Sequence, residues 1–250
     1  MTWIRINHPG TMNALNHELL DELNTSFDHV EQDESTRAVV LTGVSNAFCA
    51  GADLKSATRS DGSVDSQRFL NLIERIGRTI ERIPAVAKPV IAAVNGVAAA
   101  GGLELMLACD VVIAAKGARI GDAHANFGLV PAAGGATRTA RIAGPIVAKY
   151  LEFTGTFPPP ESLASWGLVN EVVADDELEA RAEAIAQQIA GKSSTGLAHM
   201  KRLVDEGLNH AFAESLRMEL EALAEQSRAP DFSEGMDAFR AKRTPHFNAQ

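Results

Sequence analysis

The fold prediction rests on the stretch VNGVAAAGGLE, residues 94–104. This stretch continues a β-branched run and ends in what the sequence predicts to be the start of a buried helix. The adjacent glycines Gly101 and Gly102 let another molecule come close to the backbone, and the free N–H groups of a first helical turn point toward negative charge. Glu104 follows Gly101 by three residues, so we expect it to act on the same bound molecule.

Strand and helix patterns alternate on both sides of this stretch. Apolar residues recur at helical spacing over 13–30 and again over 69–83, where the helix is expected to end before Pro84. The predicted strands cover 2–7, 37–43, 89–94 and 110–114. Such alternation predicts an α/β fold.

The last third of the chain has helical patterns over about 175–189, 195–208 and 211–227, with Asp175 as the expected cap of the first. We therefore divide the chain into a core, residues 1–190, and a C-terminal helical region, residues 191–250.

Composition and charge exclude several classes of protein. The formal net charge of −9 argues against nucleic acid as a partner, because phosphate binding needs a basic surface. The apolar run 89–115 is interrupted by Asn95, Glu104 and Asp110, and the N-terminus lacks a basic region followed by an apolar one. We expect a cytoplasmic protein that has no membrane span.

The sequence contains none of the usual metal or nucleophile motifs. The chain has two cysteines, and they do not form a CxxC pair, so neither a disulfide framework nor a zinc knuckle is predicted. Nucleophile-elbow, phosphate-loop and HExxH patterns are also missing from it. We expect no metal and no separate cofactor.

A second glycine-containing segment, NAFCAGADLK at 46–55, follows a predicted strand. A sharp turn at Gly51 would expose the N–H of Ala52, and Asp53 could hold the turn or cap the next segment. Taken alone, a structural turn is the simpler interpretation. Two such segments in one chain favour a binding site, however, because two backbone N–H donors that converge on one carbonyl oxygen make an oxyanion hole, where a single donor contributes about 3 to 4 kcal/mol.

Five segments, in this order and spacing, resemble the enoyl-CoA hydratase/isomerase (crotonase) superfamily over nearly the whole chain: FCAGADLK, IAAVNGVAAAGGLELMLACDVVIAA, FGLVPAAGGATR, ASWGLVNEVV and SEGMDAFRAKRTPHF. The resemblance implies an α/β spiral of ββα repeats with a C-terminal helical trimerisation region, and hence a homotrimer or a dimer of trimers. Family members usually begin with a strand hairpin before the segment matched here by 8–15. Since a single short strand precedes it, we expect either a missing hairpin or a misassigned start.

The resemblance also assigns roles at the site. The N–H groups of Ala52 and Gly101 would polarise the thioester carbonyl of an acyl-CoA and stabilise an enolate. Glu104 matches the first of the two glutamates with which hydratases of the family handle water and protons. The second position holds His124, which either supplies a proton or is a structural histidine. Ala132 and Ala133 stand where isomerases and dehalogenases often carry an aspartate, which argues against those reactions.

Coenzyme A would bind as part of the substrate. By the resemblance, Lys55 and the pair Phe239 and Lys242 contact its nucleotide, the pair often from a neighbouring subunit. The alternative for Lys242 is a solvated helix end. The substrate-binding residues expected in full are Ala50, Gly51, Asp53, Leu54, Lys55, Gly102, Phe239 and Lys242.

Three functions stay open at this point. The leading prediction is an enoyl-CoA hydratase that adds water to the α,β double bond. The second is another enolate reaction, such as isomerisation, decarboxylation or carbon–carbon cleavage, that uses His124. The third is an acyl-CoA-binding subunit without catalysis.

Overall fold

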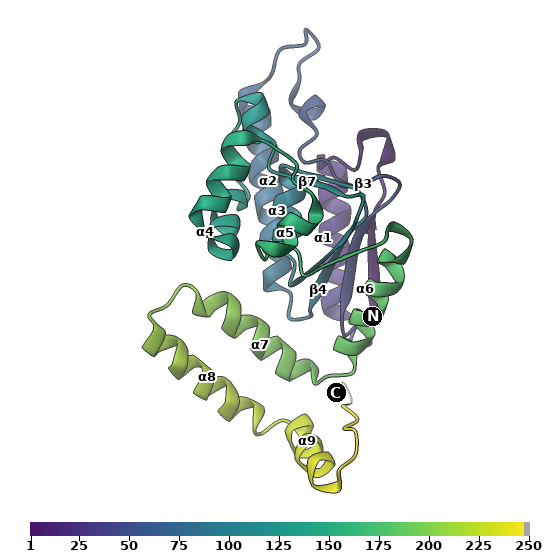
Figure 1. Ribbon diagram of the computed structural model, residues 1–250, viewed down its shortest axis with the longest axis vertical. Helices are drawn as coiled ribbons and strands as arrows, with labels where there is room; N and C mark the ends of the chain where they lie inside the picture. The colour runs from purple at the N-terminus through teal and green to yellow at the C-terminus, as the bar shows by residue number, and fades with distance from the viewer. Residues whose placement is uncertain (248–250) are drawn as a thin grey trace.

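The computed structural model describes residues 1–247 and contains two parallel sheets. The larger sheet has five strands in the order β1-β2-β4-β6-β8, and the smaller has three in the order β3-β5-β7 (Figure 1). The strands are β1 (Thr2–Ile6), β2 (Val39–Gly43), β3 (Ala47–Cys49), β4 (Val90–Val94), β5 (Val97–Ala99), β6 (Val111–Ala115), β7 (Arg119–Gly121) and β8 (Glu171–Val173). The predicted α/β class is therefore confirmed.

Helices follow pairs of strands, one from each sheet. The units β2-β3-α2, β4-β5-α3 and β6-β7-α4 succeed one another along the chain, which is the repeating ββα order expected from the resemblance. The α-helices are α1 (His17–Gln32), α2 (Ser66–Ala85), α3 (Gly101–Leu107), α4 (Gly135–Thr154), α5 (Pro160–Ser165), α6 (Leu178–Ala190), α7 (Ser194–Gly207), α8 (Phe212–Gln226) and α9 (Pro230–Ala241). Short 3-10 turns are η1 (Pro9–Thr11), η2 (Leu54–Ala57), η3 (His124–Phe127) and η4 (Asp175–Glu177).

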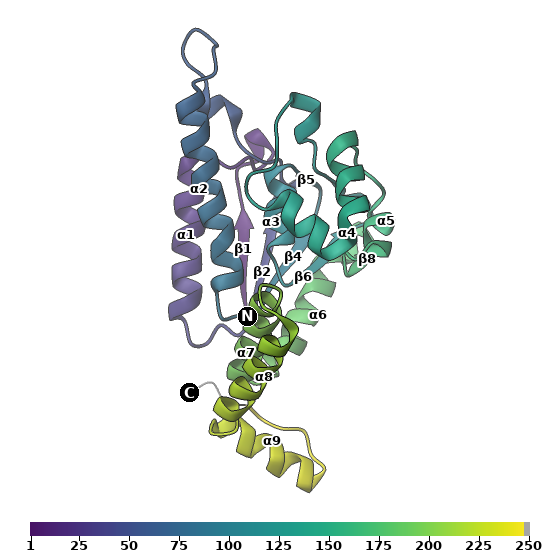
Figure 2. The same cartoon turned by 90° about the vertical axis from the view of Figure 1, so that its left-hand side faces the viewer.

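The central strands β2 and β4 are buried along their whole length, as their apolar sequences VVLTG and VIAAV require. Helices α1 and α2 lie side by side against the sheet (Figure 2). At the edge of the sheet, β1 has β2 as its strand partner within residues 1–247. The part of the chain that the structure describes contains no helix that is both long and apolar enough to cross a bilayer.

Two predicted helix boundaries are wrong. Helix α2 continues through Pro84 to Ala85. A proline in the last turn removes only one backbone hydrogen bond, and the N–H of Val86 still donates to the Arg82 carbonyl. Asp175 does not cap α6. Its carboxylate accepts instead from the N–H of Gly117 at 2.8 Å, which ties η4 to the end of β6.

Helices α7, α8 and α9 form an arm that extends away from the sheets in both views (Figures 1 and 2). The ammonium of Lys201 on α7 fixes the arm to the core. It donates to the Asp110 carboxylate at 2.9 Å and to the Ile83 carbonyl at 2.8 Å, and its side chain is only 6% exposed. The predicted domain boundary falls at the end of α6, but the division into two domains stays a prediction, and residues 248–250 of the second part lie outside the described residues.

Candidate active site

The two glycine-containing segments lie side by side because β3 pairs in parallel with β5. Gly51 adopts a φ of +97°, and a Cβ there would lie 2.9 Å from the Ala99 carbonyl oxygen and 3.2 Å from the Gly101 nitrogen. Only glycine fits both this backbone conformation and this close approach. Gly51 lies outside any turn, between β3 and the bridge that joins Ala52 to Leu15, so the sharp turn predicted there is not found. Its positive φ still brings the segment around Ala52 beside the start of α3.

Backbone pairing on one side of Ala52 directs its N–H to the other side. The Gly51 carbonyl accepts from the N–H of Leu15 at 2.7 Å, and the N–H of Asp53 donates to the Leu15 carbonyl at 2.9 Å. Since neighbouring peptide groups of an extended chain alternate in direction, the N–H of Ala52 faces away from Leu15, toward Gly101. Within residues 1–247, the N–H groups of Ala52 and Gly101 donate no backbone hydrogen bond.

Ala100, just before α3, holds a backbone conformation that L-residues rarely adopt. Its φ of 50° and ψ of −115° cost on the order of 1 to 3 kcal/mol. Two hydrogen bonds stabilise it, from its own N–H to the Gly121 carbonyl and from the Glu104 N–H to its carbonyl, each at 3.1 Å. The strained residue sets the direction in which the N–H of Gly101 leaves the helix start.

Gly102 packs α3 directly on β3. A Cβ at this position would lie 1.9 Å from the Cys49 carbonyl oxygen, so no larger residue fits without a backbone shift. The second glycine of the pair is thus required by packing. Its predicted contact with substrate stays a prediction.

Glu104 is 3% exposed, and backbone donors fix its carboxylate. Its Oε1 accepts from the N–H of Ala133 at 2.7 Å and from the N–H of Gly135 at 2.9 Å. The Arg138 guanidinium supports this loop by donating to the Ala133 carbonyl at 2.8 Å, and it also pairs with Glu81 at 2.5 Å. One oxygen of Glu104 is therefore committed to the loop, and the carboxylate is held in one orientation at the start of α3.

His124 begins η3 and forms a close pair with Asp122. The ring Nδ1 lies 3.1 Å from both carboxylate oxygens, and the backbone N–H of His124 also donates to Asp122 at 3.1 Å. A carboxylate accepts hydrogen bonds, so Nδ1 carries a proton and the second ring nitrogen is left for other partners. The side chains of His124 and Asp122 are only 11% and 2% exposed.

Burial and neighbouring charges act in opposite directions on the imidazole. Burial of the ring disfavours its charged form, but the hydrogen bond to Asp122 and the negative charges of Asp122, Glu104 and Glu152 outweigh that effect. The pKa of His124 is consequently raised above its ordinary value.

The remaining predicted residues of the first segment lie on η2 and the turn before it. Asp53 accepts from the N–H of Lys55 at 3.1 Å and so caps η2, which confirms the predicted capping role. Leu54 is 44% exposed, and Lys55 is exposed beside it. Ala50 donates its N–H to the Met12 carbonyl at 3.1 Å, so its own amide is used in holding the segment.

Phe239 and Lys242 do not join this group within one chain. They lie at the end of α9, at the opposite end of the molecule from β3 (Figure 1). Phe239 is 80% exposed, and Lys242 ends the helix in a left-handed conformation. Within one chain, these two residues therefore lie apart from the candidate site.

Sequence reasoning missed two asparagines that hold the turn before β3. Asn13, fully buried and left-handed with φ 59°, donates to the Ala47 carbonyl at 2.7 Å, and Asn95 accepts from the N–H of Gly43 at 3.0 Å. Glu152, near the end of α4, was also missed.

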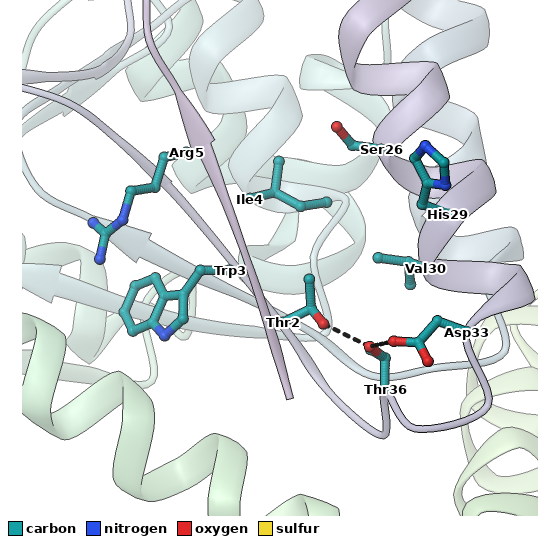
Figure 3. A pocket seen from close by; sticks show the side chains of 9 residues that line it. All are labelled: Thr2, Trp3, Ile4, Arg5, Ser26, His29, Val30, Asp33 and Thr36. Carbon is teal, nitrogen blue, oxygen red and sulfur yellow. Dashed lines mark hydrogen bonds between the residues drawn. The ribbon is translucent and has the colours of Figure 1, made fainter.

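A surface cavity of about 290 Å³ lies elsewhere, between β1 and α1 (Figure 3). Its lining includes Trp3, Ser26 and His29, and a hydrogen-bonded chain of Thr2, Thr36 and Asp33 closes one side. It shares no residue with the candidate active site. Within residues 1–247, no three His, Cys, Asp or Glu side chains are arranged to hold a metal ion.

Parallel strands wound into ββα units, with a buried glutamate at the start of α3, define a protein of the crotonase-type α/β class. The family model described as enoyl-CoA hydratase/isomerase matches residues 1–250. The chain belongs to the enoyl-CoA hydratase/isomerase family.

Individual relatives match over nearly the full length. A probable enoyl-CoA hydratase of Bacillus subtilis is 36% identical over 97% of this chain and 93% of its own. The 1,2-epoxyphenylacetyl-CoA isomerase of Escherichia coli is 33% identical over 99% of this chain and 94% of its own. The crystal structure of an enoyl-CoA hydratase from Bacillus anthracis superimposes with a TM-score of 0.93 at 35% identity, covering 99% of this chain and 95% of the other.

Proposed function

We propose that the protein is an enoyl-CoA hydratase that adds water across the α,β double bond of an acyl-CoA thioester. The observation that carries the proposal is the placement of Glu104, whose carboxylate is fixed by two backbone N–H groups three residues after Gly101. A base held beside an oxyanion hole is the arrangement that this addition needs. Family membership and the relative named as a hydratase support the same reaction.

The reaction begins at the thioester carbonyl. Its oxygen accepts hydrogen bonds from the N–H groups of Ala52 and Gly101, which stabilise the negative charge that develops there as the enolate forms. Glu104 takes a proton from water, and the resulting hydroxide oxygen bonds to the β-carbon. The electron pair of the double bond moves toward the thioester oxygen, so charge appears where the two donors point.

Protonation of the α-carbon completes the addition. His124, charged and held by Asp122, gives the proton from its second ring nitrogen, and the enolate electron pair forms the new C–H bond. The product carries one hydroxyl and one hydrogen more than the substrate. Glu104 then holds the proton taken from water, and its transfer back to His124 resets the site.

The coenzyme A moiety requires positive charge against an acidic background. Lys55, exposed on η2 three residues after Ala52, is the cation that we assign to a phosphate of the nucleotide. Phe239 and Lys242 would come from a neighbouring subunit. No separate cofactor takes part, because the thioester itself supplies the activated carbonyl.

Self-association as a homotrimer or a dimer of trimers is part of the proposal. The arm carries large apolar side chains that are 43% to 80% exposed in the single chain, more than a monomer ordinarily leaves in contact with water. They are Met200, Val204, Leu208, Phe212, Leu216, Leu220, Leu223, Met236 and Phe239. Chemical crosslinking or light scattering measures the number of subunits. A cytoplasmic location also stays a prediction.

The decisive experiment is an assay of crotonyl-CoA and longer enoyl-CoAs with purified protein, in which loss of the conjugated double bond is followed by absorbance. We expect turnover on at least one chain length. Folded protein that hydrates none of them would contradict the proposal, and retained CoA binding would then favour an acyl-CoA-binding subunit.

A second candidate function is another enolate reaction, and the observation that favours it is the imidazole of His124 at the position where hydratases carry a glutamate. The isomerase relative from Escherichia coli shows that the family includes such chemistry. Product mass separates the two candidates, because hydration adds one water and isomerisation leaves the mass unchanged.

A further inference from the structure

Glu152 is a further carboxylate near the segment of His124, and it comes from the C-terminal end of α4. It lies in the last turn of α4, one residue after the buried Leu151 and four after the buried Ala148. The end of α4 is fixed against η3 by Asn126, whose side-chain amide donates to the Gly155 carbonyl at 2.9 Å. The carboxylate is therefore held beside the segment that carries His124.

One oxygen of Glu152 is buried without a hydrogen-bond partner among residues 1–247. Such an oxygen costs about 1 to 3 kcal/mol, and an apolar side chain at this position would avoid the cost. The carboxylate is thus free to act on its neighbours through its charge.

The surroundings of Glu152 indicate which group its charge acts on. Burial, then the negative charge of Asp122, raises the pKa of Glu152, and the imidazolium of His124 opposes the rise. Reciprocally, the charges of Asp122, Glu104 and Glu152 raise the pKa of His124 against the effect of burial. Three carboxylates thus act on the ring: Asp122 by direct hydrogen bonds, and Glu104 of α3 and Glu152 of α4 through their charges.

We propose that Glu152 is a positioning residue that keeps the transferable proton on His124, as the outer carboxylate of an Asp122–His124–Glu152 cluster. The inference rests on the proposed function, in which His124 protonates the α-carbon. Loss of the ring proton leaves Asp122 and Glu152 as two negative charges in a poorly solvated space, so the cluster favours the protonated ring. The charge of Glu152 acts on His124 and does not touch the substrate.

The test compares Glu152→Gln with Glu22→Gln, which removes a carboxylate from the exposed face of α1. Ring resonances of the seven histidines are titrated by NMR without substrate, and His124 is identified by the signal lost in His124→Gln. We expect His124 to lose its proton at a lower pH in Glu152→Gln and at an unchanged pH in Glu22→Gln. An unchanged midpoint in Glu152→Gln would overturn the inference.

Kinetics give a second readout that a merely structural role would not produce. In Glu152→Gln the alkaline limb of the kcat profile moves to lower pH, with a loss of about threefold or more on that limb, while KM is nearly unchanged. An equal loss at every pH would overturn the inference. Because the titration needs no turnover, absence of hydration by the unmodified protein would contradict the proposed function without changing the NMR result.

A third measurement needs no variant and covers the case in which Glu152→Gln fails to fold. The side-chain carboxyl carbon of Glu152, observed by NMR in the unmodified protein, should respond again in the pH range where His124 titrates. A carboxyl chemical shift that does not change over the pH range where His124 titrates would overturn the proposed cluster.

Discussion

The two halves of the candidate active site are built from different chemical groups. Main-chain N–H groups make one half: those of Ala52 and Gly101 are the proposed oxyanion donors, and those of Ala133 and Gly135 fix Glu104. Side chains make the other half, in which Asp122 and Glu152 act on His124. The first half is set by strand pairing and glycine packing, so the fold dictates it. The second half depends on residue identity and can change while the fold stays the same.

The largest effect is expected from replacing Glu104, the side chain that the main-chain N–H groups hold in place. Glu104→Gln keeps an oxygen for the N–H groups of Ala133 and Gly135 but removes the base. We expect kcat for enoyl-CoA hydration to fall about 10³-fold while KM changes little. Circular dichroism and thermal melting serve as controls for folding, and activity within about threefold of the unmodified protein would contradict the role of Glu104.

Two glycine-to-alanine substitutions, at Gly102 and at Gly77, test whether packing accounts for a glycine in the main-chain half. Gly102→Ala places a Cβ 1.9 Å from the Cys49 carbonyl oxygen, and we expect a loss of about 3 kcal/mol in the free energy of unfolding. Gly77→Ala on α2 is the matched control, because its nearest neighbour is 3.9 Å away and alanine favours a helix by up to about 1 kcal/mol. Chemical denaturation measures both. Equal effects at the two positions would contradict the packing role of Gly102.

The side-chain half is tested at Asp122. Because the pKa of His124 is raised in the folded protein, the ring keeps its proton above the ordinary value of about 6.5, and activity that needs this proton is lost as pH rises through the raised pKa. Asp122→Asn removes the hydrogen-bonded charge, so the alkaline limb should move to lower pH and kcat should fall about tenfold. A pH profile that stays in place would show that His124 is not the proton donor.

The smallest effect is expected from the support of the Glu104 loop. Arg138→Met removes the bond to the Ala133 carbonyl and leaves both N–H donors present. We expect kcat to fall about threefold because Glu104 is less firmly oriented, with no shift in the pH profile. A shift of the alkaline limb would instead show that Arg138 acts on His124, as the side-chain half does.

The sequence predicted more of the main-chain half of the site than of the side-chain half. Glycines at Gly51 and Gly101 mark sites where a backbone comes close, so the helix start at Gly101 could be predicted from residue type. The short strands β3 and β5, whose pairing brings the two segments together, were not predicted. His124 was found because it departs from a recognised pattern.

Glu152 could not be found in this way. It stands in an ordinary amphipathic helix, and only the folded chain brings α4 against η3. Asn13 was missed for a similar reason, because its bond to Ala47 joins residues 34 positions apart.

The buried ammonium of Lys201 has a consequence for the cooperativity of the molecule. Its partner Asp110 also accepts from the N–H of Val90, the first residue of β4. Burial raises the pKa of Asp110 and Lys201 opposes the rise, so a departing α7 would leave a poorly solvated carboxylate at the start of that strand. Hydrogen exchange at the arm and at the beginning of β4 should therefore report one shared opening event. Subunits that assemble through the arm would slow exchange in the strand that leads into the oxyanion-hole segment.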